Sequence, residues 1–154
     1  MTDCYTCATE NALDDAPDRE RVWVGEHWRL SHAFDTALPG WLVLVPRRHV
    51  TRIAEHGRAE AAELGTLLVA ASAALETVTG CTKTYVAQFA EAAGFAHTHF
   101  HVVPRPADLP EDRRGPRVFG LLGAPVPQRV SEAARDDLAR RLRAVIADSL
   151  GATT

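Results

Sequence analysis

Residues 97–105 read HTHFHVVPR, with a histidine at every second position ahead of two valines, a proline and an arginine. Alternate residues of a β-strand point to the same face of a sheet. We therefore expect a strand at 97–103 with its three histidines on one face, namely His97, His99 and His101. The residues between them would point into the core, and Pro104 and Pro106 would end the strand. Ser, Thr, Lys or Glu would serve a plain polar surface equally well, so the row of histidines indicates a catalytic or metal-binding role.

Two kinds of chemistry suit this row. His-x-His on a strand can hold a metal, but an open catalytic site needs a third ligand, and the next acid is Asp108, beyond two prolines. A neutral imidazole, with a pKa of about 6.5, is also a good nucleophile near neutral pH. Attack on phosphorus would split one difficult substitution into two easier steps. The residues alone leave both possibilities open.

The segments around the row indicate an α+β fold with an antiparallel sheet. Further strands are expected in three apolar or alternating segments, at 21–34 (two strands around Gly25), 41–46 and 81–89. Apolar residues at 3.6-residue spacing predict two helices, at 58–79 and 131–150. Gly80 is expected to cap the first of these helices, and Ser131 the second, with Gly151 past its end. Residues 104–129, rich in proline, glycine and arginine, are expected to form a long functional surface loop.

Composition limits the classes of function. The chain has 154 residues, enough for one domain (1–154), and a net charge of −3, which argues against stable nucleic-acid binding. We find no basic region followed by an apolar run at the N-terminus, and no apolar stretch near the roughly 18–20 residues that cross a bilayer. We therefore expect a cytoplasmic protein without a membrane segment, whose cysteines are reduced.

An N-terminal segment, 1–20, contains the sequence Cys4-Tyr-Thr-Cys7. A thioredoxin-type redox pair would follow a strand and open a helix, whereas this pair comes almost at the start of the chain. The cysteines could be unrelated surface residues, or they could be half of a zinc site. For the other half the candidates are Cys81, His49 and His97, and Cys81 is more typical of a buried apolar residue.

Two motifs resemble those of a known family. HTHFHVV (97–103) is similar to the His-φ-His-φ-His-φ-φ signature of the histidine triad superfamily of nucleotide hydrolases and transferases, with Thr98 at a position expected to be apolar. LPGWLVLVPRRHV (38–50) resembles a second segment of that family, a Pro-Gly turn, an apolar strand and Pro-basic-basic-His. The resemblance covers about residues 4–105 and implies a histidine-triad-like fold, with about five antiparallel strands, a long helix and a C-terminal helix.

The resemblance also implies roles for individual residues. His99 would be the nucleophile that forms a nucleotidyl-histidine, and the His97 carbonyl would hold its ring. His101 would contact the phosphoryl oxygens and leaving group. Asp35 would hold the ribose, and Gln88 would face the α-phosphate.

In zinc-bearing members the metal ligands correspond to Cys4, Cys7, His49 and His97, which would form a structural Zn²⁺ site. The implied activity is that of a hydrolase or transferase acting at the α-phosphorus of a nucleoside phosphate, in a homodimer. The alternative is a zinc-stabilised module that binds nucleotides without turning them over.

The chain departs from the family before the first histidine. The family usually has a Gly-Gln-Ser/Thr-like segment that holds the α-phosphate, whereas EAAGFAH (91–97) has no Gln, Ser or Thr. Gly94 could keep an amide contact. The donors that a developing negative charge requires are then expected from arginines of the loop. These are Arg105, Arg113, Arg114 and Arg117.

Overall fold

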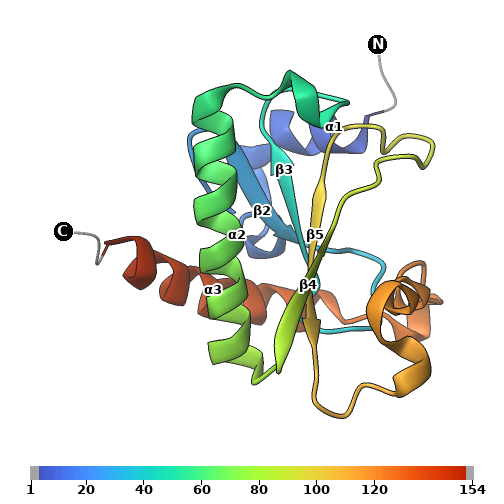
Figure 1. The fold of residues 1–154 in the computed structure, drawn as a ribbon. Helices are drawn as coiled ribbons and strands as arrows, with labels where there is room; N and C mark the ends of the chain where they lie inside the picture. Colours follow the sequence, from blue (N-terminus) through green and yellow to red (C-terminus); the bar gives the residue numbers. More distant parts are fainter. Residues whose placement is uncertain (1–3, 152–154) are drawn as a thin grey trace.

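The computed structural model describes residues 4–151, which form the predicted α+β fold around a five-stranded antiparallel sheet (Figure 1). The strand order is β1-β2-β3-β5-β4, and the strands are β1 Trp23–Val24, β2 Trp28–His32, β3 Leu42–Pro46, β4 Lys83–Ala87 and β5 Phe100–Arg105. The helices are α1 Tyr5–Asn11, α2 Arg58–Thr79 and α3 Glu132–Gly151. The apolar run at 41–46 is a central strand, as predicted, because β3 pairs with β2 on one side and β5 on the other.

Helix α2 has the predicted bounds and covers one face of the sheet. Its apolar stripe, which includes Leu67, Ala71 and Leu75, joins the main core with Leu42 and Leu44 of β3. Gly80 ends the helix in the left-handed conformation, with φ 71°, and donates its N–H to the Glu76 carbonyl. Helix α3 packs across α2 on the same side of the sheet (Figure 1).

The histidine strand differs from its predicted bounds at both ends. It begins at Phe100, because the Thr98 amide is engaged by the Val50 carbonyl, 2.7 Å away, outside the strand ladder. It also continues through Pro104 to Arg105. The pairing of β3 covers only Phe100–Val102, so at Pro104 the strand has a neighbour, β4, on one side alone. A sheet tolerates proline at such a position because no ladder hydrogen bond is lost.

The long segment after β5 is more ordered than the sequence predicted. It contains three 3₁₀ turns, η4 Glu111–Arg113, η5 Gly115–Leu121 and η6 Val126–Gln128. Its Leu109 and Val118 are buried in a second core cluster with Trp41 and Val103. Helix α3 follows, capped by Ser131, whose hydroxyl accepts the Ala134 N–H at 3.2 Å. Gly151 belongs to the last turn of α3 rather than lying past it.

Helix α2 is also long and apolar enough to cross a bilayer by length and composition, with a mean hydropathy of 1.4 over its most apolar window. The sequence reading of the chain did not identify this stretch. The core helix of a globular domain passes the same test, and α2 buries one face against β4, β5 and α3. The hydropathy of α2 is therefore weak evidence for a membrane span.

Glu60, in the first turn of α2, joins the helix to β2 and to the connection between β3 and α2. Its carboxylate accepts hydrogen bonds from Nε and Nη2 of Arg48, at 2.6 and 2.8 Å, and from the Gly57 N–H at 2.7 Å. Its carbonyl accepts the indole N–H of Trp28 at 2.8 Å. The Arg48 guanidinium is the main cause that lowers the pKa of Glu60 from 4.5 to about 2.

We predict that Glu60→Gln lowers the free energy of unfolding by about 1–2 kcal/mol, because hydrogen bonds to a charged acceptor are replaced by weaker ones. The folded pKa of Glu60 lies below its ordinary value, so its contribution is present above about pH 4.5 and is lost as the pH falls towards 2. Urea unfolding between pH 2 and 7 measures both effects. Glu132→Gln, at an exposed ion pair with Arg19, is the control. Equal stability of the two variants would contradict the prediction.

Candidate functional site

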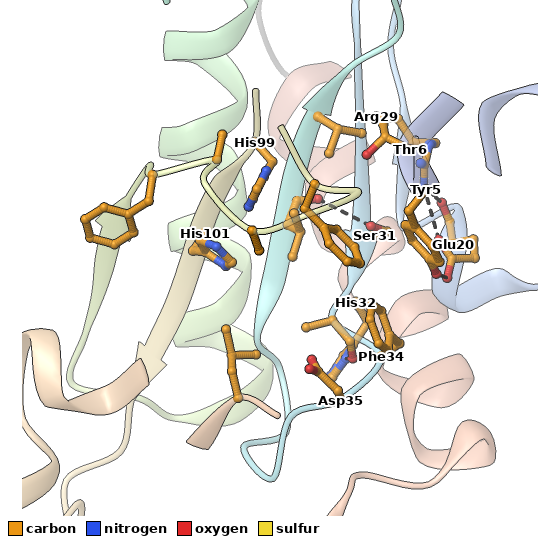
Figure 2. Close-up of a pocket in the computed structure, with 18 of the residues that line it drawn as sticks. Tyr5, Thr6, Glu20, Arg29, Ser31, His32, Phe34, Asp35, His99 and His101 are labelled. Atoms are coloured by element: carbon orange, nitrogen blue, oxygen red, sulfur yellow. Dashed lines mark hydrogen bonds and ion pairs between the residues drawn. The ribbon is translucent and has the colours of Figure 1, made fainter. Parts of the chain in front are cut away.

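A pocket of about 340 Å³ lies on the sheet face opposite α2. Strand alternation produces this arrangement, because Leu42 and Leu44 face the α2 core while Val43 and Val45 line the pocket. Figure 2 shows His99 and His101 on one side of the pocket, with Tyr5, Thr6, Glu20 and Arg29 on the other. The volume falls within the range of small-molecule sites.

The His99 ring is held by the backbone of its own segment. Its Nδ1 lies 2.8 Å from the His97 carbonyl oxygen. A carbonyl only accepts hydrogen bonds, so Nδ1 carries the proton and Nε2 of the neutral ring keeps its lone pair. His99 is one of the residues that line the pocket, and it is therefore within reach of a ligand as a nucleophile.

His101 is the second triad histidine in the pocket. Its ring lies nearly perpendicular to that of His99, with centroids 4.9 Å apart. Its Nδ1 accepts the indole N–H of Trp41 at 3.0 Å. Burial, and secondarily the neighbouring His99, lower the pKa of His101 to about 4. The ring is consequently neutral at pH 7.

The side chain of His97 is not among those that line the pocket, contrary to the expected row of three histidines on one face. The strand begins only at Phe100, so the backbone at His97 is free to turn this side chain away. Its Nε2 lies 2.9 Å from the Pro46 carbonyl, and its Nδ1 points to Cys4 and Cys7. His97 meets the pocket through the carbonyl that holds His99.

The four residues expected to bind metal come together. The ligand atoms of Cys4, Cys7, His49 and His97 all lie within 4.8 Å of one another. The distances from Cys4 Sγ and Cys7 Sγ to His97 Nδ1 are 3.5 and 3.6 Å, and Cys7 Sγ lies 3.2 Å from His49 Nδ1. In a tetrahedral zinc site, S and N ligands are about 3.6 Å apart. The donor set and its spacing therefore fit a closed metal site.

The surroundings of His97 also suit a metal ligand. Its Nε2–H is directed at the Pro46 carbonyl, which leaves the Nδ1 lone pair towards the two sulfurs. Burial is the main cause that lowers the pKa of His97, which favours the neutral form that a ligand requires. The ring of His49, the other histidine of the cluster, lies nearly perpendicular to the ring of His97, with centroids 5.0 Å apart.

The cysteine segment forms one wall of the pocket. Cys4 and Cys7 flank Tyr5 and Thr6, which both line the pocket. The Tyr5 ring packs against Phe34 and Phe95, with centroid distances of 5.2 and 5.5 Å. The sequence reading missed this aromatic wall. An aromatic residue directly before Asp35, Phe34, could have suggested an aromatic wall near the ribose-binding candidate. Its contact with Tyr5 was not predictable, because the two residues are nearly 30 positions apart in the chain.

A buried arginine lies at the same end of the pocket. Arg29 of β2 pairs with the carboxylates of Glu10 and Glu20, at 3.2 and 3.3 Å. Glu10 also pairs with Arg47 at 2.6 Å. These ion pairs fasten α1 to the sheet, since Glu10 is on α1 and Arg29 on β2. None of these residues was singled out from the sequence.

The expected substrate-binding residues lie in different places. Asp35 lines the pocket, where one of its carboxylate oxygens accepts the Gly123 N–H at 3.0 Å. Gln88 is not among the lining residues, although its neighbours Phe89 and Ala90 are. Gly94 is also outside the lining, and its carbonyl accepts the Tyr5 N–H at 3.3 Å.

The arginines that were expected to supply phosphate donors are not among the residues that line the pocket, so the structure lends this prediction no support. Arg105 lies four residues beyond His101 at the far end of β5, where its guanidinium is 3.4 Å from Thr82 Oγ1. Arg114 and Arg117 bond to backbone carbonyls within the segment itself, and Arg113 lies beside Gly120. The segment does reach the pocket, but it contributes the apolar side chains of Phe119 and Leu122.

Comparison with solved structures identifies the fold. The chain superposes on a Zn-bound histidine triad family protein from Mycobacterium smegmatis with a TM-score of 0.67, at 22% identity over 97% of this chain and 96% of that one. A histidine triad protein from Bradyrhizobium japonicum gives 0.68, at 23% identity over 88% and 94% of the two chains. One from Sinorhizobium meliloti gives 0.63, at 26% identity over 86% and 91%.

No protein-family model matches this chain, and no curated protein matches it. The assignment therefore depends on the shared fold together with the two sequence motifs, which the structure brings to one pocket. On these grounds the chain has the fold of the histidine triad proteins, and its two motifs resemble those of that superfamily.

Proposed function

We propose that this protein is a nucleotidyl hydrolase or transferase, which acts at the α-phosphorus of a nucleoside phosphate through a nucleotidyl-histidine on His99. The observation that carries the proposal is the 2.8 Å contact between His99 Nδ1 and the His97 carbonyl. It fixes the tautomer whose Nε2 is the nucleophile, in a pocket of suitable size. Structurally similar proteins include one described as a hypothetical histidine triad nucleotide-binding protein, from Sulfolobus tokodaii.

The reaction has two displacements. In the first, the lone pair of His99 Nε2 forms a bond to the α-phosphorus, and the leaving group departs with the electrons of its own bond to phosphorus. The His97 carbonyl stabilises the positive charge that the ring acquires, because Nδ1–H continues to donate to it. In the second, water breaks the P–N bond and releases a nucleoside monophosphate. In a transferase another acceptor replaces the water.

The pocket provides places for the rest of a nucleotide. Asp35 has one carboxylate oxygen engaged by Gly123 and a second for ribose hydroxyls. The Tyr5, Phe34 and Phe95 rings offer an apolar surface for a base. Because the arginines of the long segment point elsewhere, the phosphoryl oxygens depend on His101 and on backbone amides.

We predict that the wild-type protein becomes covalently labelled by an α-³²P nucleoside phosphate and that His99→Ala abolishes the label. Turnover should fall by at least about 10³-fold, because the covalent route is lost. A panel of nucleoside 5′-phosphates with amine, nucleotide, sulfate and sugar-phosphate leaving groups identifies the substrate class. His27→Ala, at a partly exposed histidine beside Glu26, is the control.

Two results would contradict the role of His99. One is near-normal activity of His99→Ala together with loss of activity in His101→Ala. The other is wild-type protein that binds these nucleotides but is never labelled, which would favour the alternative of a nucleotide-binding module without turnover.

We propose zinc as the metal held by Cys4, Cys7, His49 and His97. The distances between these ligands and the Cys₂His₂ set support a structural tetrahedral site. When bound, the metal supplies folding free energy and no chemistry at phosphorus. It would hold His97, and with it the carbonyl that orients His99, and it would fix α1 over the pocket.

We predict about one zinc per chain by elemental analysis of the purified protein. Removal by a chelator should lower the melting temperature, because the ligand set lies between α1 and the sheet and loses its cross-link. Cys7→Ser should act in the same direction, whereas Cys81→Ser, in the main core, should not change the zinc content. A metal-free protein of unchanged stability would rule out the structural zinc.

We propose that the protein forms a homodimer through β4 and α2. Strand β4 is at the edge of the sheet, and next to it α2 exposes Val69, which is 71% accessible, while β4 exposes Val86 at 49%. Thr84 Oγ1 bonds to Ser72 Oγ at 2.8 Å, so the two elements form one continuous surface. A second copy that pairs with the edge strand would also cover these valines.

We predict a dimer at micromolar concentration by light scattering, with at least about 1,000 Å² buried in total. Val69→Glu should shift the protein to a monomer, because a carboxylate would be buried in the contact. Val126→Glu, at an equally exposed valine of η6, serves as the matched control. A wild-type monomer, or the same response to both substitutions, would contradict this interface.

A further inference from the structure

We propose that Trp41 is a positioning residue that fixes the tautomer of His101, so that His101 presents an N–H rather than a lone pair to the phosphoryl oxygens. The kinetic consequence depends on the proposed function, whereas the tautomer does not. The basis is a single buried hydrogen bond between two residues 60 positions apart in the chain.

The chemistry of the two rings determines the position of the proton. An indole N–H can only donate, so His101 Nδ1, 3.0 Å from Trp41 Nε1, must accept. The single proton of the neutral imidazole is then on Nε2. Trp41 is fully buried and His101 is 8% exposed, so water does not compete for this bond. The proton on Nε2 is therefore set by Trp41 and not by solvent.

The sheet register brings the two residues together. Val43 of β3 pairs with His101 of β5, and Trp41 lies two residues from Val43, on the same face and diagonal to His101. The segment before β3 is held in place by its backbone. The Trp41 carbonyl accepts the Ala33 N–H at 2.9 Å, and the Gly40 N–H donates to His32 Nε2 at 2.9 Å.

A third ring completes the support of His101. Phe119, from η5 of the long segment, lies 5.2 Å from Trp41 and 5.0 Å from His101, and Trp41 lies 5.8 Å from His101, between ring centroids. The three rings are mutually near-perpendicular, with interplanar angles of 85–89°. These contacts hold the His101 ring in the orientation that keeps Nδ1 at the indole N–H, because a turned ring would place Cδ2 there instead.

The result is a pair of histidines in opposite tautomers. The His97 carbonyl gives His99 a proton on Nδ1 and a lone pair on Nε2, and the Trp41 indole gives His101 an unprotonated Nδ1 and a proton on Nε2. Attack by His99 increases negative charge on the phosphoryl oxygens, which then require donors. With the arginines of the long segment turned away, an Nε2–H on His101 meets this need. A lone pair at that nitrogen would instead repel the oxygens.

The test removes the indole N–H with two replacements, of which only the second keeps the size of the ring. Trp41→Phe removes the donor, and benzothienylalanine at position 41 is an isosteric replacement with sulfur in place of N–H, which preserves the fit of the buried ring. Trp28→Phe is the matched control. Trp28 is equally buried and donates its indole N–H at 2.8 Å to the Glu60 carbonyl, far in sequence from the triad.

Two measurements follow on the intact protein. Imidazole ¹⁵N NMR at pH 7, assigned with His101→Gln, should show an unprotonated Nδ1 for His101 in the wild type and in Trp28→Phe. Both replacements at position 41 should add a population with a protonated Nδ1. With an adenosine 5′-phosphoramidate as probe, kcat should fall by at least about 10-fold at position 41 while KM changes little, because the lost bond acts in the transition state.

An unchanged ¹⁵N pattern after loss of the indole N–H would overturn the tautomer assignment. A kcat loss no greater than that of Trp28→Phe would overturn the positioning role. If the wild type turns over no probe, the proposed function fails, and the NMR result alone still decides whether Trp41 sets the tautomer.

Discussion

The hydrogen bond from His99 Nδ1–H to the His97 carbonyl is the interaction on which the rest of the site depends. It makes one imidazole nitrogen of known protonation available in the pocket. The residue that supplies the carbonyl directs its own side chain to the cluster with Cys4, Cys7 and His49. His97 thus belongs to two candidate sites, with its backbone at the proposed nucleophile and its ring in the cluster of possible metal ligands. The start of β5 at Phe100, rather than at His97, makes this division possible.

Helix α1 also contributes to both the pocket and the metal cluster. Its Cys7, together with Cys4 directly before the helix, contributes to the metal cluster. Its Tyr5 and Thr6 line the pocket, and its Glu10 pairs with the buried Arg29 of the sheet. The N-terminal helix therefore forms a wall of the ligand site as well as a structural attachment. A change in the metal cluster would shift the position of the Tyr5 ring in the aromatic wall, because Cys4 and Tyr5 are adjacent in the chain.

The long segment between β5 and α3 contributes apolar side chains to the pocket, although its composition is rich in arginine. Its arginines suggested phosphate binding, yet Arg114 and Arg117 bond to local carbonyls. The side chains that it contributes to the pocket are Phe119 and Leu122. Phe119 completes the set of rings around His101. Control of His101 thus comes from aromatic contacts and one indole N–H instead of cationic groups.

The sequence by itself determined the bounds of α2 and the buried central strand, because periodicity is a local property. The residues of the metal cluster and the candidate nucleophile came from motifs that resemble those of a known family. The sequence did not determine where β5 begins, which way His97 and the arginines point, or the bond between Trp41 and His101. Those depend on the β3–β5 register, on the Val50 carbonyl that engages Thr98, and on the packing of the long segment over the sheet. Such contacts join residues tens of positions apart, and only the folded chain fixes their geometry.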